Sequence, residues 1–270
     1  MEKYKISIIT ICLNAEKTIE KTINSVISQD YSNLEYIIVD GKSSDNTIGI
    51  IKNFHDPRIR WVSEKDNGIS DAFNKGINLS TGEFIGLINA DDYLVPHAIK
   101  SLMNQYDGNS DVIYGNTIVD DKENGLKIIK KARNPELLKY EMPFIHQSSL
   151  VKFSAYKKYG YYSTDYKICM DYELFARFYK NGASFQYIDT YVSFFSYGGT
   201  SSLHPFRTAS EDISIARIYG LSLIDSLQYK FKVYFRNAIK MVLVKLGIWK
   251  RLYQVFKKEN LYHEEGHING

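Results

Sequence analysis

The sequence predicts an α/β fold with a doubly wound, mostly parallel β-sheet. Apolar runs of strand length alternate with helix-like segments from residue 5 to residue 89. This order builds a parallel sheet with helices on both faces and right-handed crossovers between the strands. A chain of 270 residues is long enough for one large domain of this kind together with an appendage.

The first half of the chain supplies the predicted parallel strands and the helices between them. Lys5–Leu13 is rich in β-branched residues and nearly all apolar, which favours a buried strand. Lys17–Gln29 has apolar residues such as Ile19, Ile23 and Val26 on one face, as in an amphipathic helix. The alternation continues with predicted strands over Leu34–Val39, Ile59–Val62 and Phe84–Ile88, and predicted helices over Thr47–Phe54, Ile69–Leu79 and Pro96–Gln105.

The second half predicts a less regular α+β extension of the same domain. A strand over Asp111–Tyr114 is followed by Gly115 and Asn116, and Thr117–Val119 can pair with Leu126–Lys130 as a hairpin. The later predicted elements are a short helix and polar loop within Asn134–Ser149, a helical turn over Ser154–Lys158, a tyrosine-rich loop over Tyr159–Tyr166, a helix over Met170–Asn181, a strand within Ser184–Phe195, a flexible loop over Gly198–Ser202 and a helix over Glu211–Ser226.

The composition changes most sharply near Gln228. Between Gln228 and Lys258 there are nine Lys or Arg residues and no Asp or Glu, so the remainder of a chain with net charge +3 is net acidic. We therefore expect three parts: residues 1–120, residues 121–227 of the same domain, and a basic C-terminal helical tail over residues 228–270.

The basic tail has an apolar face. On one helical wheel this face contains Phe231, Phe235, Ala238, Val242, Leu246, Trp249, Tyr253 and Phe256, and Gly247 can divide the helix. A basic helix of this kind can lie in a membrane interface and favour anionic lipids. The alternative is a C-terminal helix that packs its apolar stripe on the domain. We favour a membrane surface as the partner of the tail.

The rest of the composition indicates a cytoplasmic protein that does not bind nucleic acid. Cys12 and Cys169 are far apart and lack metal-ligand spacing, which favours a reduced, cytosolic setting. Met1–Lys5 leads directly into a strand without an apolar signal segment, and no apolar run is long enough to span a bilayer. The acidic body and the lack of a recognition module disfavour nucleic acid as a partner.

Two adjacent carboxylates follow the central strand. Asp91 and Asp92 come directly after the apolar run Phe84–Ile88 and the linking residues Asn89 and Ala90. Ligands of open α/β sheets bind beyond the carboxyl ends of the strands, and hard oxygen ligands there suit a divalent cation that also holds phosphates. Either Asp can instead cap the helix that begins near Pro96. Because a cap needs only one carboxylate, we favour the metal and phosphate site.

Other strand ends indicate a nucleotide site at the same edge. Thr10 and Asn14 lie at the end of the first strand, and Asp40, at the end of the second, can accept a hydrogen bond from a nucleobase. The alternative for Asp40 is turn chemistry, which Asp45 can supply alone. Asp71 and Asn74 lie in a segment that opens a helix, where phosphate is attracted; Lys75 is equally consistent with a solvated helix face. A dinucleotide fold is disfavoured because no G-x-G-x-x-G follows the first strand.

Together these stretches resemble the family 2 inverting glycosyltransferases of the GT-A fold. The matching residues are Ser7–Asn14, Val39–Thr47, Gly68–Gly76 and Asn89–Asp92. The resemblance implies that residues 1–120 bind a nucleotide-sugar, that Asp40 contacts the base, usually uracil, and that Asp91 and Asp92 meet ribose and Mn²⁺ or Mg²⁺. Relatives often carry Asp where this chain has Asn89. The resemblance therefore does not decide whether Asp91 or Asp92 is the metal ligand. We favour Asp92 for the metal and Asp91 for ribose.

The resemblance also implies a catalytic base in residues 121–227, the acceptor-binding half. Asp171, near the start of the predicted helix Met170–Asn181, matches the carboxylate that takes the proton from the acceptor hydroxyl. Its alternative role is an N-cap. His146 and Gln147 resemble a pair in relatives that build bacterial surface polysaccharides, on the acceptor or the diphosphate side; the alternative is a hydrogen-bonded loop histidine. His204 can approach the diphosphate from its loop.

The expected function is therefore metal-dependent, inverting transfer of a hexose from a UDP-sugar to a glycan acceptor. A lipid-diphosphate-linked acceptor, in bacterial polysaccharide or O-antigen synthesis at the inner face of the plasma membrane, agrees with the basic tail. Two alternatives stay open: the same reaction with a GDP- or dTDP-sugar, and a nucleotide-binding assembly subunit without catalysis.

Overall fold

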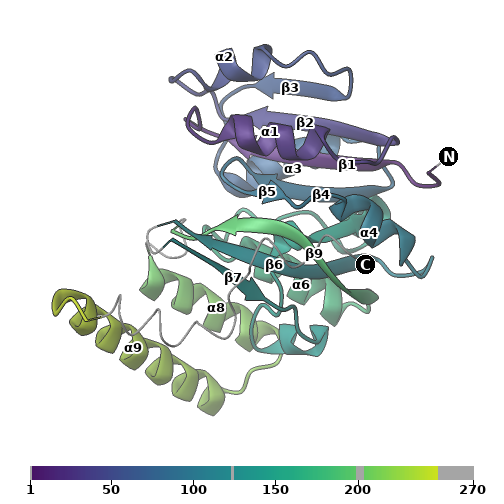
Figure 1. The fold of residues 1–270 in the computed structure, drawn as a ribbon. Helices are drawn as coiled ribbons and strands as arrows, with labels where there is room; N and C mark the ends of the chain where they lie inside the picture. Colours follow the sequence, from purple (N-terminus) through teal and green to yellow (C-terminus); the bar gives the residue numbers. More distant parts are fainter. Residues whose placement is uncertain (1, 123–124, 199–203, 249–270) are drawn as a thin grey trace.

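The computed structural model describes residues 2–122, 125–198 and 204–248 (Figure 1). Its N-terminal part is a parallel sheet in the order β3-β2-β1-β4. These strands are β1 (Ile6–Cys12), β2 (Leu34–Asp40), β3 (Ile59–Ser63) and β4 (Phe84–Asn89). The register aligns Cys12 with Asp40 and Ile11 with Asn89, so the carboxyl ends of β2, β1 and β4 form one edge.

The same sheet continues through strands of the second half. These are β5 (Tyr93–Leu94), β6 (Val112–Asp121), β7 (Leu126–Lys130), β8 (Ser149–Lys152) and β9 (Phe185–Ser196). Strand β8 lies antiparallel between β4 and β6, while β9 runs parallel to β6 and antiparallel to β5. The mixed pairing is the α+β extension that the sequence predicts.

Helices cover both faces of the sheet (Figure 1). Side chains of α1 (Ile19–Ile27), α2 (Thr47–Lys52) and α4 (Ala98–Asn104) join one apolar core, and those of α3 (Ile69–Leu79), α5 (Phe153–Tyr159) and α6 (Met170–Lys180) join the other. Along β1, Ile8 belongs to the first core and Ile9 to the second, because successive side chains of a strand point to opposite faces. This arrangement confirms the predicted doubly wound fold.

The predicted hairpin of Thr117–Val119 with Leu126–Lys130 is confirmed, while other details of the second half differ from the prediction. Asp111–Tyr114 and Thr117–Val119 are one strand, β6, whose register against β9 shifts beside Gly115. A Cβ at Gly115 would lie 2.7 Å from the carbonyl oxygen of Thr190, so glycine permits this close approach. Strand β8 begins at Ser149, the expected end of a loop, and continues over residues 150–152, to which the sequence assigned no element. It was missed because a strand this short has too few residues to show a periodicity. Single-turn helices over Pro135–Lys139 and His146–Ser148 replace the single short helix expected there.

The C-terminal helices also differ from the prediction. The helix expected over Glu211–Ser226 is two helices, α8 (Pro205–Tyr219) and α9 (Leu223–Lys245), separated at Gly220 by a backbone φ of 149°. Helix α9 packs along α8 at the end of the molecule far from β1–β3 (Figure 1). The boundary expected at Gln228 falls inside α9, and residues 249–270 of the tail lie outside the described residues. None of the helices described is apolar over a length that would cross a bilayer.

A buried glutamate fastens the opposite edge of the sheet, where β1 and β2 begin. Glu35 accepts hydrogen bonds from the Ser7 hydroxyl (2.5 Å) and the Thr81 backbone N–H (2.5 Å), and lies 3.1 Å from the Lys5 ammonium. Burial raises the pKa of Glu35, but these donors outweigh burial and lower the pKa to about 2. The interaction joins β1, β2 and the turn before β4.

We predict that Glu35→Gln lowers the melting temperature by a few degrees at neutral pH, because the charge-assisted bonds are lost. The folded-state pKa lies below the ordinary value of 4.5, so the contribution of Glu35 is present above pH 4.5 and is lost as the pH falls towards 2. Thermal melts of both proteins should therefore converge over that interval. A difference that does not change with pH would show that Glu35 does not stabilise the fold through its charge.

Candidate active site

The acidic pair lies just beyond the carboxyl end of β4, with its two members in different surroundings. Asp92 is 1% exposed; its carboxylate accepts hydrogen bonds from the Ser196 backbone N–H (2.8 Å) and from the side-chain amides of Gln147 (2.7 Å) and Asn89 (3.3 Å). Asp91 is exposed, and its backbone carbonyl accepts a bond from the Ser196 hydroxyl at 2.6 Å. Burial, and then the charge of Asp91, raise the pKa of Asp92 to about 8.

These surroundings bear on which carboxylate fits a metal ion. A cation at Asp92 would have to displace several hydrogen bonds from a buried side chain, whereas Asp91 is an exposed residue whose carboxylate is still desolvated enough for burial to raise its pKa. Within residues 2–122, 125–198 and 204–248, no group of three or more His, Cys, Asp or Glu side chains is placed to enclose a metal. One exposed carboxylate fits Mg²⁺ or Mn²⁺ held jointly with substrate phosphates and water, which is how such ions often bind. The sequence favoured Asp92 for the metal; that assignment stays a prediction, and Asp91 is the more accessible of the two residues.

Asp40 and Asn14 hold the loops that follow β2 and β1. Asp40 is fully buried and accepts hydrogen bonds from the Ser43 backbone N–H (2.9 Å), the Ser43 hydroxyl and the Ser63 hydroxyl (2.7 Å). Asn14, at a φ of 52°, accepts a bond from the Ser44 N–H at 2.8 Å. Both residues therefore lie at the expected edge and shape its surface, and their contact with a nucleotide stays a prediction.

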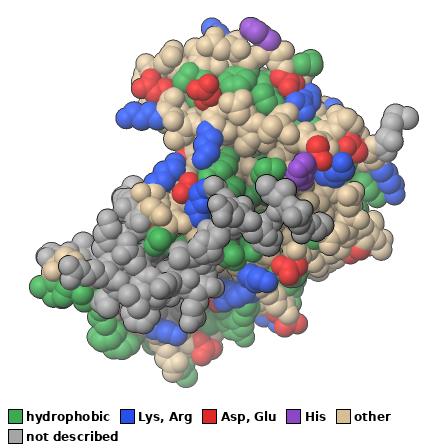
Figure 2. Space-filling view, in the orientation of Figure 1, with side chains coloured by type: hydrophobic (Ala, Val, Ile, Leu, Met, Phe, Trp, Pro, Cys, Tyr) green, Lys and Arg blue, Asp and Glu red, His purple; other side chains and the backbone are tan. Residues whose placement is uncertain are grey.

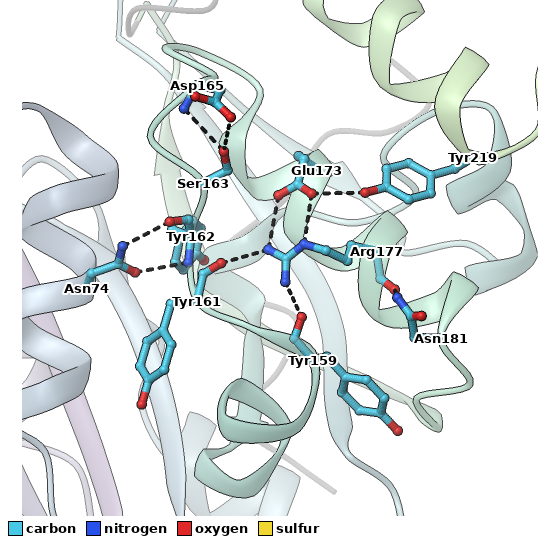
Figure 3. A network of polar contacts seen from close by, with 10 residues as sticks. All are labelled: Asn74, Tyr159, Tyr161, Tyr162, Ser163, Asp165, Glu173, Arg177, Asn181 and Tyr219. Atoms are coloured by element: carbon cyan, nitrogen blue, oxygen red, sulfur yellow. Dashed lines mark hydrogen bonds and ion pairs between the residues drawn. The ribbon is translucent and has the colours of Figure 1, made fainter.

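Thr10 and the predicted residues of α3 have partners within the protein. Thr10 is buried inside β1, where its hydroxyl accepts a hydrogen bond from Tyr36 at 2.9 Å. Asp71 accepts a bond from the Asn67 N–H at 2.9 Å. Asn74 uses both ends of its amide on the backbone of Tyr162, at 2.9 and 3.0 Å, and so ties α3 to the tyrosine-rich loop (Figure 3).

Asp171 lies in the first turn of α6, as predicted, with its side chain 26% exposed. One carboxylate oxygen lies 3.3 Å from His146 Nδ1, and the other accepts the backbone N–H of Tyr172 at 2.8 Å. Burial raises the pKa of Asp171, but the contact with His146 and the Tyr172 N–H outweigh it, so the pKa lies below its ordinary value. A carboxylate that stays ionised and partly accessible suits a general base.

The adjacent residue, Gln147, contacts the acidic pair. Gln147 is 2% exposed and donates to Asp92, while His146 contacts Asp171. Both residues come immediately before β8, and β8 runs antiparallel to β4 with Leu150 opposite Gly86. The amino end of β8 therefore lies beside the carboxyl end of β4, which brings His146 and Gln147 to the acidic pair.

His204 takes a different position. It is exposed and precedes α8, where its backbone carbonyl accepts a hydrogen bond from the Thr208 N–H at 3.0 Å. Its described contacts do not reach Asp91 or Asp92, and the neighbouring residues 199–203 lie outside the described part of the chain.

Two supporting residues were missed by sequence analysis. Ser196, at the end of β9, binds both members of the acidic pair, and Glu211 of α8 accepts hydrogen bonds from the backbone N–H groups of Ile168 (2.9 Å) and Cys169 (3.1 Å) just before α6. Glu211 thus fixes the start of the helix that carries Asp171. Neither residue belongs to a local motif, since each acts on a segment far away in the sequence.

An ion pair inside α6 fastens the tyrosine-rich loop (Figure 3). Arg177 donates to Glu173 at 2.8 and 3.1 Å, and also to the backbone carbonyls of Tyr159 and Tyr161, the latter at 2.7 Å. Glu173 is 5% exposed and accepts a further bond from the Tyr219 hydroxyl at 3.0 Å. Arg177 is therefore an ion-pair partner inside the fold.

The site opens at the edge where β1, β2 and β4 end. The space-filling view is hollowed at its left, between the part built from these strands and the part below it, and Lys and Arg side chains gather around this hollow (Figure 2). The acidic pair and Asp171 lie near each other, because the consecutive residues Gln147 and His146 contact Asp92 and Asp171.

Comparison with known proteins gives the family. Residues 7–170, more than half of the chain, match the model of glycosyl transferase family 2. The chain belongs to this family. It is 34% identical over 128 residues to the E. coli UDP-Glc:alpha-D-GlcNAc-diphosphoundecaprenol beta-1,3-glucosyltransferase WfgD, covering 44% of this chain and 51% of WfgD. The chain spans about half the length of the curated relatives that it matches.

Solved structures show the same fold at low sequence identity. S. aureus TarS (residues 1–349) aligns with a TM-score of 0.64 and 18% identity, over 87% of this chain and 74% of TarS. TarS structures in complex with UDP and with UDP-GlcNAc also align. The Pyrobaculum calidifontis mannosyltransferase PcManGT, in complex with GDP-Man and Mn²⁺, aligns with a TM-score of 0.64 and 15% identity, over 90% of this chain and 75% of PcManGT. The GT-A fold expected for this chain is confirmed.

We predict that Arg177→Met destabilises the protein by about 3–5 kcal/mol, because it leaves the buried carboxylate of Glu173 without its counter-charge. The double variant Glu173→Gln with Arg177→Met should recover part of this loss, since the uncompensated charge is gone. Urea denaturation of the two variants measures the difference. Equal stability of the single and double variants would contradict the ion-pair account.

Proposed function

We propose that the protein is an inverting glycosyltransferase that moves a hexose from a UDP-sugar to a lipid-diphosphate-linked glycan in bacterial polysaccharide or O-antigen synthesis. The observation that carries this proposal is the arrangement of carboxylates beside His146 and Gln147. It combines an exposed carboxylate at the end of β4 with a second, ionised carboxylate at the start of α6. Direct displacement by an acceptor hydroxyl needs one carboxylate near the leaving diphosphate and another near the attacking oxygen.

In this mechanism Asp171 is the general base. Its carboxylate accepts the proton of the acceptor hydroxyl as that oxygen attacks the anomeric carbon, and the transition state resembles an oxocarbenium ion. His146, at 3.3 Å, orients the carboxylate and helps to keep it ionised. A single displacement of this kind inverts the configuration at the anomeric carbon.

Asp91 is the residue that we propose to hold the divalent cation, Mn²⁺ or Mg²⁺. When bound, such a cation neutralises charge on the departing diphosphate. Asp92 stays in its hydrogen-bonded position and fixes the loop after β4 through Ser196 and Gln147. The Lys and Arg side chains around the hollow add attraction for a diphosphate (Figure 2).

UDP is the proposed nucleotide, and the proposed part of Asp40 is to shape, through its bonds to Ser43 and Ser63, the loop that receives the base. The name of WfgD and the UDP complexes of TarS support this choice. A GDP-sugar is the second candidate, because PcManGT, which shares the fold, binds GDP-Man. The proposed acceptor follows WfgD, whose name specifies a sugar linked to diphosphoundecaprenol.

We further propose that α9 attaches the protein to the inner face of the membrane. Ile224, Leu227, Phe231, Phe235 and Val242 recur at helical spacing and are 57–72% exposed, so they form a stripe that does not pack on the body. Apolar side chains gather at the lower left of Figure 2, where Figure 1 places α9. An exposed apolar stripe in a segment rich in Lys and Arg fits an anionic lipid surface.

Asp171→Asn tests the catalytic proposal. We expect transfer from UDP-glucose to fall by at least a factor of about 100, because an amide cannot accept the proton. UDP binding should be nearly unchanged, since Asp171 lies on the acceptor side. Turnover and calorimetric titration with UDP measure the two effects. Turnover like that of the wild type would remove Asp171 as the base.

The double variant Phe231→Glu with Phe235→Glu tests the membrane proposal. It should release the protein from vesicles that contain anionic lipid, as measured by co-sedimentation, because charge in the apolar stripe opposes insertion. Ile218→Glu, at a 52% exposed position of α8, adds the same charge outside the stripe and serves as the control. The proposal would be contradicted if the double variant bound vesicles as strongly as the wild type. It would also be contradicted if the wild type formed dimers in solution and did not sediment with vesicles.

A further inference from the structure

Two adjacent side chains connect the acidic pair with Asp171. Gln147 Nε2 donates to Asp92 at 2.7 Å, and His146 Nδ1 lies 3.3 Å from the carboxylate of Asp171. Their segment is held by hydroxyl groups: Ser148 bonds to Thr117 (2.6 Å) and Ser193 (2.7 Å). His146 and Gln147 are therefore fixed in position before any substrate arrives.

Each of these side chains has one buried polar atom without a hydrogen bond among the described residues. The atoms are Nε2 of His146 and Oε1 of Gln147. A buried polar atom without a partner costs about 1–3 kcal/mol, and such atoms are rare in native proteins. Two of them on consecutive residues, between Asp92 and Asp171, indicate that a ligand supplies the missing partners.

The other bonds of these residues determine the chemistry of both atoms. Nδ1 of His146 faces a carboxylate oxygen of Asp171, which accepts a hydrogen bond, so the tautomer that fits this contact carries its proton on Nδ1 and has Nε2 as an acceptor. Gln147 uses its amide N–H on the carboxylate of Asp92, which leaves the carbonyl Oε1, also an acceptor. Both atoms therefore require a donor. Phosphate oxygens supply none, whereas sugar hydroxyl groups do.

We propose that His146 Nε2 and Gln147 Oε1 accept hydrogen bonds from hydroxyl groups of a sugar bound between the acidic pair and Asp171. The inference rests on the proposed function and assigns sugar recognition, rather than diphosphate binding, to this pair. The hydroxyl groups belong either to the hexose of the donor or to the terminal sugar of the acceptor, and the experiment below separates these two sources.

His146→Asn separates ligand recognition from the positioning of Asp171. The amide nitrogen of Asn can take the place of Nδ1 and still donate to Asp171, but nothing replaces Nε2. In the matched variant His146→Gln, the side-chain amide takes the place of Nε2 and no polar atom takes the place of Nδ1. We expect His146→Asn to keep the affinity for UDP and to weaken sugar recognition roughly three- to tenfold, the size of one hydrogen bond.

Fluorinated sugars show which hydroxyl is recognised, since fluorine cannot donate a hydrogen bond. The donor probes are UDP-glucose and analogues with one hydroxyl replaced by fluorine. The acceptor probes are N-acetylglucosamine diphosphate on a short alkyl chain and its fluorinated analogues. For the wild type, one analogue should lose roughly three- to tenfold in affinity or in kcat/KM, and His146→Asn should be insensitive to that replacement. A sensitive donor analogue assigns the pair to the hexose, and a sensitive acceptor analogue assigns it to the acceptor.

The inference would be overturned if every analogue lowered affinity or kcat/KM equally for the wild type and for His146→Asn. It would also be overturned if His146→Asn bound the sugar as well as the wild type does. Both results would leave His146 as a residue that only positions Asp171. Failure of the proposed function looks different: the wild type would then bind neither UDP nor UDP-glucose and would transfer no sugar. Thermal melts identify any variant that has failed to fold, and the fluorinated series with the wild type alone still tests the inference.

Discussion

A carboxylate that is buried away from water needs hydrogen-bond donors around it, and the fold meets this requirement at several separate places. Serine hydroxyl and backbone N–H groups surround Asp40, amide groups surround Asp92, and Arg177 neutralises Glu173. In each case the donor groups lie on another strand or loop than the acid, or on the next turn of the same helix. The same bonds that satisfy the polar groups of these buried acids therefore fasten neighbouring elements together.

Strand β8 connects this network to the proposed chemistry. It is only four residues long, yet its antiparallel pairing with β4 places the preceding segment at the edge where β4 ends. His146 then contacts the proposed base, and Gln147 contacts the buried acid. The two halves of the domain share one sheet, so the position of the acidic pair relative to Asp171 is set by backbone register as well as by loops.

The first half of the fold could be predicted closely from the sequence because its elements have local signatures. The apolar run of β4, the periodicity of α1 and the glycine and serine turns each identify one element without its neighbours. Strands β5 and β8 could not be found in this way, since two and four residues carry too little periodicity. The break between α8 and α9 at Gly220 was also missed, because both segments are helical in character.

In the site, too, the sequence indicated which residues matter but not which distant residues contact them. Asp91, Asp92 and Asp171 could be singled out because they lie beside a strand end or in the first turn of a helix. Their different burial could not, because the donors to Asp92 come from Gln147 and Ser196, far along the chain. For that reason the sequence favoured Asp92 as the metal ligand, whereas Asp91 is the more accessible of the two residues.

Calorimetric titration with UDP, GDP and dTDP, each with and without Mn²⁺, tests the central claim most directly. The account predicts that UDP binds best, that Mn²⁺ strengthens the binding, and that Asp91→Asn abolishes the Mn²⁺ effect while leaving the metal-free affinity nearly unchanged. A preference for GDP or dTDP would keep the transferase and change its donor. No nucleotide binding by the folded protein, or a full Mn²⁺ effect in Asp91→Asn, would contradict the account.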